Sequence, residues 1–356
     1  MLVEVLQPFL SFLERDVHQL EDIQADSRAF QDPSIKAMFQ HAVSHPESIN
    51  EILSQLTAFL DSEADTYKKG LACIMSGTLV EYGGDPSLIV DSVVRQLERH
   101  LILIEAYLAN EELSTEEHFL SRPDTVKARV TSDFVILATM TMICRNKQAR
   151  NQMRQNEGLV RLIESLYEHI DNLEYVHDVL NSVDDLEVVA LHPETLSGVR
   201  VRLETVQNNF HLFTLLQDVM LQSFHVKEPF ASMQRNEVAI KAASGIEYPE
   251  TSGASDEALF GFFNRFGLDE NSGELKQNEL EGWIFGEMMP THIPRIDGKA
   301  MILLGEKIFA SRSWDLSFCV PVHSALSPKT ELLEVLSPEQ TKAWLDRIVA
   351  MRGRAD

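Results

Sequence analysis

Apolar residues recur at intervals of three and four along most of the first 185 residues, and this spacing predicts amphipathic helices. The first such pattern runs over residues 2–24. Asp85 and Pro86 supply a helix cap and a first-turn proline, so another helix is expected to begin there and to continue past residue 104. We therefore expect residues 1–185 to form a helical domain.

The pattern changes near residue 186, where a period of two replaces the helical spacing. Residues 187–191 form a mostly apolar run, and residues 199–204 alternate apolar and charged side chains. Turn-forming residues separate the two runs, so a β-hairpin with one buried face is expected. A helix is predicted over residues 209–222. We interpret residues 186–227 as a β-hairpin and a helix that close the first domain.

The rest of the chain is predicted to hold a linker and a mixed region. Residues 228–256 are rich in Pro, Ser, Gly and Ala and are interpreted as a linker or a long loop. Ser337 and Pro338 are typical of a helix start, so a final helix is expected there. The predicted fold class is therefore mostly α, with an α+β C-terminal region over residues 257–356. Within that region we expect helices over 258–266 and 275–285, and strands over 301–304, 318–322 and 332–336.

Residues 134–168 combine several short patterns in a defined order. An apolar helix is interrupted at Asn146, a short polar helix and Gly158 follow, and a second apolar helix then begins. This order resembles the helix–turn–helix step of armadillo and HEAT repeats, and residues 71–168 resemble it more loosely. The resemblance implies an armadillo-like α-solenoid that binds peptides or proteins along a concave surface. It also implies that Leu162 is a core residue and that Gly158 occupies a sharp turn with positive φ.

The composition limits the classes of partner. The chain has 356 residues and a net charge of −24, from 55 acidic and 31 basic residues. Binding to nucleic acid or to anionic membranes is not expected, because both need clustered Lys and Arg. No apolar run approaches the roughly 18 residues that a membrane span requires, and the N-terminus lacks the basic region of a signal peptide. The three cysteines lie far apart in apolar surroundings, which favours reduced thiols in a cytoplasmic protein.

One segment runs against the overall charge. Seven basic residues lie between residues 127 and 161, and only Asp133 and Glu157 oppose them, so the local excess is five positive charges. Spacings of three and four place some of them on a common helix face. We expect a partly exposed ridge that binds acidic groups of a partner protein, with Arg150 on the surface. The predicted partner-binding residues are Lys127, Arg129, Arg145, Lys147, Arg150, Arg154 and Arg161.

Residues 246–289 have the opposite character, with ten acidic residues against Arg265 and Lys276. This segment either pairs with the basic one inside the fold or remains exposed to a partner. Residues 263–280 resemble an EF-hand in the order of their elements, but Leu268 stands where calcium needs its first oxygen ligand. We therefore interpret them as an acidic turn before a helix capped by Asn271 or Ser272, and expect no calcium site.

The remaining candidates for chemistry are weak. His41 with His45 and His177 with Asp178 are typical of polar helix ends, and Cys319 with His323 would need a turn to meet. The chain contains no nucleotide, zinc or nucleophile-elbow motif, and no cofactor is expected. The sequence favours a non-enzymatic, cytoplasmic interaction or adaptor protein. Two alternatives are an acidic inhibitor or immunity-type protein that blocks a basic partner, and a hydrolase with an unrecognised site. A deep pocket with convergent carboxylates and a histidine of perturbed pKa would favour the hydrolase.

Overall fold

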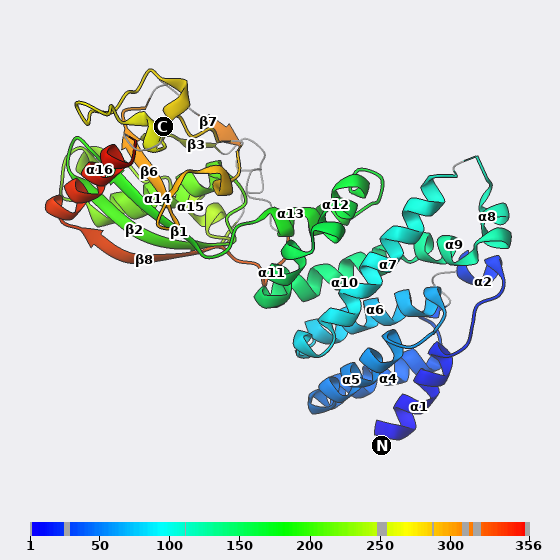
Figure 1. The fold of residues 1–356 in the computed structure, drawn as a ribbon. Coiled ribbons are helices and arrows are strands. Elements are labelled where there is room, and N and C mark those ends of the chain that lie inside the picture. Colours follow the sequence, from blue (N-terminus) through cyan, green and yellow to red (C-terminus); the bar gives the residue numbers. More distant parts are fainter. Residues whose placement is uncertain are drawn as a thin grey trace. The chain divides into compact units, whose positions relative to one another are not determined.

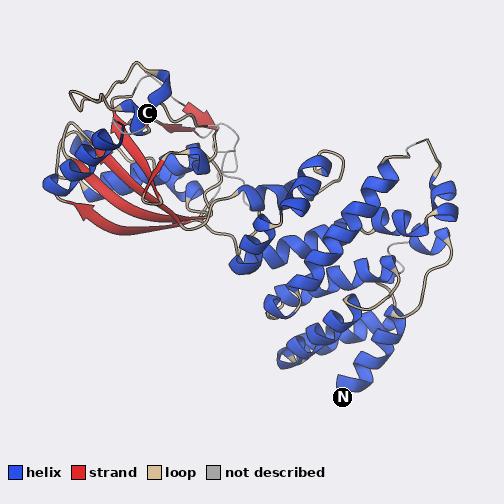
Figure 2. Cartoon of the chain, in the orientation of Figure 1, coloured by secondary structure: helices blue, strands red, loops and turns tan. Residues whose placement is uncertain are grey.

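A computed structural model of the chain separates into two compact units, residues 1–180 and residues 181–356. Among the described residues, the regular elements of the first unit are helices, whereas the second unit combines a mixed sheet with helices (Figures 1 and 2). The predicted fold class, mostly α with an α+β C-terminal region, is therefore confirmed. The structure describes residues 2–24, 29–110, 112–247, 255–286, 288–307, 313–315 and 322–352.

The helices of the first unit are connected by short turns, several of which contain a capping side chain or a proline. Asp65 and Ser114 cap the helices that follow them, and the Ser114 cap is completed by Glu117 as a capping box. The α-helices are α1 (Leu2–Leu13), α2 (Leu20–Gln24), α4 (Pro33–Ser44), α5 (Ile49–Leu60), α6 (Thr66–Glu81), α7 (Val90–Leu108), α8 (Thr115–Ser121), α9 (Pro123–Val130), α10 (Ser132–Arg145), α11 (Lys147–Gln155), α12 (Glu157–Leu166) and α13 (Leu173–Asn181).

The prediction of one helix over residues 2–24 is wrong, because α1 ends at Leu13 and α2 begins at Leu20. Between them, the main-chain N–H of Val17 donates to Asp65 Oδ2 at 3.2 Å. The Val17 side chain is also buried. This contact with the start of α6 holds the chain away from a helical path, although the apolar spacing continues through the break.

Two glycines allow α6 to pack closely against the helices around it. A Cβ at Gly70 would lie 2.4 Å from Thr131 Cβ, and a Cβ at Gly77 would lie 3.1 Å from Ala138 Cα. The α6 helix is buried on nearly all sides, since its partner α10 and the helices α5, α7 and α9 contact it. A side chain at either glycine would push these helices apart.

The segment that resembles an armadillo step has its helix boundaries at two asparagines. Asn146 Oδ1 accepts from Ala149 N at 3.0 Å, and Asn156 Oδ1 accepts from Leu159 N at 3.2 Å. The predicted break at Asn146 is thus confirmed. The predicted turn at Gly158 is wrong, because Asn156 begins α12 before the glycine and Gly158 does not have a positive φ. Leu162, predicted as core, is half-buried.

The second unit is built on a sheet with strand order β4-β6-β1-β2-β8, and β5 also pairs with β6. The strands are antiparallel except for β1 and β6, which are parallel. The strands are β1 (Leu186–His192), β2 (Ser197–Glu204), β3 (Ser255–Glu257), β4 (Gly261–Phe263), β5 (Arg295–Ile296), β6 (Lys299–Gly305), β7 (Ser313–Asp315) and β8 (Lys329–Leu336), with β3 and β7 forming a separate pair.

Each face of this sheet has its own core, as the period of two requires. Val188 and Ala190 of β1 belong to the core that includes α14 (Asn209–Ser223). Val189 and Leu191 belong to the core that includes α16 (Pro338–Arg352). The predicted hairpin, the helix after it, the strands over 301–304 and 332–336 and the final helix are confirmed. The expectation that the hairpin has one buried face is wrong for β1, because side chains on both of its faces are buried. The strand predicted over 318–322 falls almost wholly outside the described residues.

Three predictions about the second unit need correction. The hairpin and helix of residues 186–227 belong to this unit and do not close the first. The supposed linker contains a 3-10 helix (Phe230–Ser232) and α15 (Glu237–Ala243), whose buried Phe230 and Ala243 join the sheet core, while residues 248–254 lie outside the description. The helices predicted over 258–266 and 275–285 are replaced by β4 and by 3-10 helices at Arg265–Gly267 and Leu280–Gly282.

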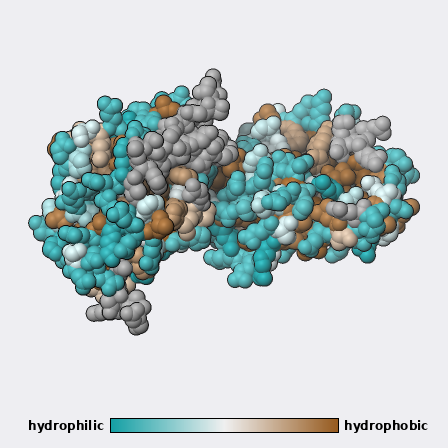
Figure 3. All heavy atoms as spheres, turned by 90° about the horizontal axis from the view of Figure 1, so that it is seen from above, coloured by the Kyte–Doolittle hydropathy of each residue, from teal (hydrophilic) through white to brown (hydrophobic). Residues whose placement is uncertain are grey.

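The surface is largely hydrophilic on the face shown in Figure 3, with hydrophobic residues in small groups. The most exposed large apolar side chains, such as Leu120 and Val226, come from separate parts of the chain. None of the helices in the described part of the chain combines the length and the apolar character needed to cross a bilayer.

Candidate functional site

The basic residues predicted to bind a partner are mostly engaged within the helical unit. Lys127 Nζ lies 2.6 Å from Asp65 Oδ2, and the two side chains are only 8% and 3% exposed. Asp65 is also the cap of α6 and accepts from the N–H groups of Tyr67 and Lys68. Lys127 therefore completes a buried cap, and the prediction that it lies on an exposed ridge is wrong.

Two of the arginines complete the C-terminal ends of helices. Arg150 is 4% exposed, and its Nη1 donates to the carbonyl of Ile143, in the last turn of α10, at 2.6 Å. Arg154 donates to the carbonyls of Leu180 and Val179 at the end of α13, at 2.8 and 3.0 Å. Carbonyls in the last turn of a helix lack partners in that helix, and a cation also suits the negative end of its dipole. The predicted surface position of Arg150 is thus wrong.

The other members of the predicted site are more accessible. Arg145 forms a two-pronged pair with Glu81, at 3.2 and 2.7 Å, and Arg161 pairs with Glu157 at the surface. Arg129 and Lys147 are half-buried. Lys127, Arg145 and Arg161 each pair with a carboxylate of the first unit, on Asp65, Glu81 and Glu157 respectively. A role in partner binding stays a prediction for the members that reach the surface.

The acidic segment forms a tight hairpin-like loop. Leu268 and Leu275 pair across it, and the Asp269 carboxylate accepts from the N–H groups of Asn271 and Ser272 at 2.9 and 2.8 Å. These backbone hydrogen bonds, with help from Lys276, lower the pKa of Asp269 to about 2. Gly273 completes the turn with φ of +70°.

The loop differs from the predicted helix cap and from an EF-hand. Asp269 is the capping residue in place of Asn271 or Ser272, and the turn is followed by extended chain instead of a helix. β4 and the 3-10 helix at Arg265–Gly267 precede the loop, so the two flanking helices of an EF-hand are missing from the described residues 261–286. Across the described parts of the chain, no three His, Cys, Asp or Glu side chains converge as metal ligands would.

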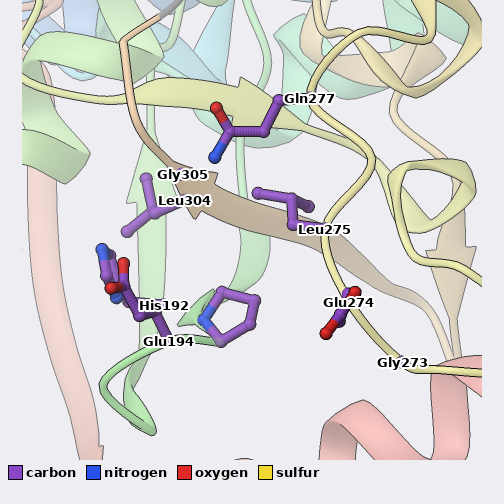
Figure 4. Close-up of a pocket in the computed structure, with 9 residues that line it drawn as sticks. His192, Glu194, Gly273, Glu274, Leu275, Gln277, Leu304 and Gly305 are labelled. Atoms are coloured by element: carbon purple, nitrogen blue, oxygen red, sulfur yellow. The ribbon is translucent and has the colours of Figure 1, made fainter.

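This loop covers a pocket at one edge of the sheet. Leu191 of β1 lies opposite Leu303 of β6, so the two parallel strands run side by side toward the pocket and end there at His192 and Gly305. Figure 4 shows His192, Glu194 and Leu304 on one side and Glu274 and Leu275 on the other. The pocket has a volume of about 310 Å³ and is lined by His192, Pro193, Glu194, Gly273, Glu274, Leu275, Gln277, Leu304 and Gly305.

A second, wider opening of about 660 Å³ adjoins this pocket and shares Glu194, Leu275 and Gln277 with it. The lining carboxylates of both are exposed. The lining cation, Lys276, already lies 3.3 Å from Asp269 and 3.2 Å from Glu279. We refer to the pocket and the opening together as the acidic cleft, after its carboxylates Glu194, Glu274, Glu279 and Glu306.

His192 is the polar lining residue with the most restricted surroundings. It is only 4% exposed, and the rings of Phe230 and Phe260 pack against it edge-on at centroid distances of 5.4 and 6.1 Å. Thr195 N donates to Nδ1 at 3.3 Å, and Thr195 Oγ1 lies 3.0 Å from the same nitrogen. Because a main-chain N–H can only donate, Nδ1 is the acceptor and the neutral ring carries its hydrogen on Nε2.

The turn that holds His192 is tied to a partly buried polar network. Thr195 Oγ1 lies 3.0 Å from Ser197 Oγ, and Lys227 Nζ donates to Ser197 Oγ at 2.8 Å and to Thr195 O at 2.5 Å. His192 and Ser197 are partners in the register of β1 and β2, so both side chains lie on the same face of the sheet. The network fixes the turn against the face that α14 and α15 cover.

The charge state of His192 bears on the hydrolase hypothesis. Burial lowers the pKa of His192, Glu194 opposes this shift, and Lys227 adds to it. The ring is therefore neutral near pH 7, with Nδ1 engaged by Thr195. A general base needs a free ring nitrogen, and Nε2 in this tautomer is a donor. Ser197, whose hydroxyl could serve as a nucleophile, is fully buried behind the turn and does not line the pocket.

The other candidates from the sequence are packing or surface features. The rings of His41 and His45 lie 4.7 Å apart, and His45 pairs with Glu47 at 3.3 Å. The His177 ring stacks on Tyr167 at 4.5 Å. Cys319 lies outside the described residues, so the pairing with His323 is not tested.

His192 was missed by sequence reasoning, because it stands at the end of an apolar strand like any residue that enters a turn. A signal was present in the turn itself. The run His192-Pro193-Glu194-Thr195 places a ring nitrogen, a carboxylate and a hydroxyl within four residues, at the end of a strand that is otherwise apolar.

The acidic cleft is the strongest candidate site in the described residues, because it joins a pocket, several carboxylates and a buried histidine. Its chemistry is derived from these side chains alone. A scan against protein-family models, a search of curated proteins and a search of solved structures each found no match.

Proposed function

We propose that this protein is a non-enzymatic interaction protein, and that its acidic cleft binds a basic segment of a partner protein. The observation that carries the proposal is the pairing of an apolar pocket wall with exposed carboxylates. Pro193, Leu275 and Leu304 line the pocket beside Glu194 and Glu274. Lys and Arg side chains need both kinds of surface, an apolar one for the methylene stem and a carboxylate for the charged head.

The exposure of the carboxylates determines how such a ligand would bind. Charges in contact with water are screened by salt, so they contribute more to the association rate and to specificity than to affinity. We therefore expect moderate affinity that falls as salt rises. The same cleft serves the hypothesis of an acidic inhibitor, which would differ by binding one cationic partner tightly. The buried, free thiols of Cys73 and Cys144 support the expected cytoplasmic location.

In this proposal the helical unit is a scaffold that resembles armadillo repeats and provides a second interaction surface. The accessible members of the basic segment, such as Arg161, would take part there. The cleft and this surface carry opposite charges, so an adaptor could hold two partners of different character. The cleft is the better supported of the two, because the basic residues with the strongest contacts are used inside the first unit.

The test is a selection of random dodecapeptides displayed on phage against the whole protein. Wild type should enrich peptides rich in Arg and Lys, and their binding should weaken as salt is raised. A cleft variant carries the substitutions Glu194→Lys, Glu274→Lys and Glu306→Lys. Since it reverses the charge around the pocket, it should lose this enrichment.

The matched control reverses three exposed glutamates of the first unit, by Glu51→Lys, Glu116→Lys and Glu164→Lys. It changes the net charge by the same amount and should still select basic peptides. Equal selection by the cleft variant and wild type would overturn the proposal. So would a consensus without basic residues.

A further inference from the structure

The buried histidine of the cleft has one ring nitrogen that the protein does not use. Both hydrogen bonds of His192 are made by Nδ1, with the N–H and the hydroxyl of Thr195. Nε2 has no hydrogen-bond partner among the described residues, and His192 is one of the residues that line the pocket. A polar group that is almost fully buried gains stability when it finds a partner, so this edge is suited to a ligand.

The direction of that hydrogen bond is fixed by the turn. Thr195 N donates to Nδ1, so Nε2 carries the hydrogen and can only donate. Lys227 reinforces this arrangement, because it donates to both Ser197 Oγ and Thr195 O and holds the turn in place. Phe230 and Phe260 pack on the ring and limit its rotation. His192 therefore offers a donor at a defined place in the cleft.

The charge of the cleft selects among possible acceptors. A carboxylate or a phosphate could accept from Nε2–H, but Glu194 and Glu274 would repel it. A neutral carbonyl oxygen avoids this repulsion. In a basic segment of a protein, a main-chain carbonyl lies close to every Lys or Arg side chain, so one residue can supply both the cation and the acceptor.

We propose that His192 is a specificity-determining residue that donates from Nε2 to a main-chain carbonyl of the ligand, next to the Lys or Arg that the glutamates hold. The inference rests on the proposed function and deepens it. It assigns the cleft to an extended basic peptide in preference to a polyamine or a free cation, which carry no carbonyl.

The tautomer can be measured on the whole protein without any ligand. Two-dimensional ¹H–¹⁵N spectra of the histidine rings at pH 7 should show a neutral His192 with its hydrogen on Nε2, identified by the signal lost in His192→Gln. A hydrogen on Nδ1, or a charged ring, would overturn the inference, because the donor would then be absent or undefined.

Binding is compared with two probes that share the same cation. One is a capped pentapeptide with a central arginine and alanines at the other positions, and the other is ethylguanidinium. His192→Leu should weaken binding of the peptide about 5–10-fold, the loss expected for one hydrogen bond. It should leave binding of ethylguanidinium unchanged. His192→Gln places an N–H near the position of Nε2 and should recover part of the affinity for the peptide.

The outcomes separate the two proposals. If neither probe binds wild type, the proposed function fails and the inference fails with it. If both probes bind and the cleft variant weakens both, the proposed function stands. In that case, equal effects of His192→Leu on the two probes, or no effect on either, would overturn the role of His192 alone.

Discussion

The basic segment over residues 127–161 and the acidic segment over residues 246–289 have opposite local charges in the sequence. Their charged side chains also differ in where they lie in the structure. In the first, Lys127, Arg150 and Arg154 are turned into the helical unit, where they pair with a cap or with carbonyls. In the second, several carboxylates remain exposed, and some line a cleft. A local excess of charge therefore does not by itself reveal an interaction surface.

The difference follows from the backbones that the two segments serve. Stacked helices end in carbonyls that lack partners, and long cationic side chains can reach them from a neighbouring helix. The acidic loop has no such need, because Asp269 and the pairing of Leu268 with Leu275 satisfy its turn from within. Its remaining carboxylates, such as Glu274, are left to face solvent.

The buried pair in the basic segment should be the most sensitive point. Asp65→Asn keeps the shape of the side chain but leaves the Lys127 ammonium buried without its counterion. We expect it to lower the free energy of unfolding by about 3–5 kcal/mol, as is usual when one partner of a buried pair is removed. Denaturant melts followed by far-UV circular dichroism would measure the loss.

Lys127→Met is the matched variant on the other side of the pair. Asp65 would keep its three N–H donors from Val17, Tyr67 and Lys68, so a smaller loss, of about 1–3 kcal/mol, is expected. Since the three tryptophans all belong to the second unit, their fluorescence reports on a unit that neither variant touches. Losses below 1 kcal/mol for both variants would mean that the basic segment is not held by its interior contacts.

The response to acid should be alike in the two units, although their segments differ in charge. Burial lowers the pKa of His100 in the first unit and of His211 in the second to about 4. The unfolded chain binds these protons near pH 6.5, whereas the folded chain stays neutral until about pH 4. Stability is therefore complete above pH 6.5 and falls as pH drops toward 4.

Each histidine should account for a loss on the order of 3 kcal/mol over that range. Melts at several pH values, followed by circular dichroism and by tryptophan fluorescence, would show both transitions weakening. If charge repulsion governed the acidic unit, its transition would strengthen as carboxylates are neutralised. That result would contradict the expectation that the buried histidines, and not the net charge, determine how stability depends on pH.

The arginines of the basic segment should divide into two classes. Arg150→Ala removes a buried charged hydrogen bond and leaves the carbonyl of Ile143 without its donor, so a loss of about 2 kcal/mol is expected. Arg161→Ala removes only a surface pair whose side chains are 74% and 86% exposed, and about 0.5 kcal/mol or less is expected. Equal effects in denaturant melts would restore the idea of one continuous surface ridge.

The elements that could be predicted from the sequence are those in which local pattern and packing agree. Side chains of β1 and β2 alternate between the two faces of the sheet, and Ser337 caps α16 where its cap sequence indicates. The prediction of a helix over Phe260–Phe263 failed because periodicity cannot assign so short an apolar run to a helix or a strand, and pairing with β6 decides the outcome. The cleft joins residues distant in sequence, such as His192 and Glu274. Local periodicity cannot predict which distant residues come together in the fold.

The smallest expected effects concern two glycines, Gly158 in the basic segment and Gly273 in the acidic loop. The armadillo-like order predicted a special turn at Gly158, but this residue lies in the first turn of α12, where the nearest atom to an added Cβ is Asn156 Oδ1 at an ordinary 3.5 Å. Gly158→Ala should therefore stabilise the first unit by about 0.5 kcal/mol, by reducing the freedom of the unfolded chain.

Gly273, with φ of +70°, holds the strained position in the acidic loop, although no atom lies within 4 Å of an added Cβ. Gly273→Ala should cost about 1 kcal/mol from backbone strain alone. Circular dichroism melts of the first variant and fluorescence melts of the second would measure these opposite signs. If Gly158→Ala were destabilising, the result would indicate a sharp turn at Gly158, as the resemblance to armadillo repeats implied.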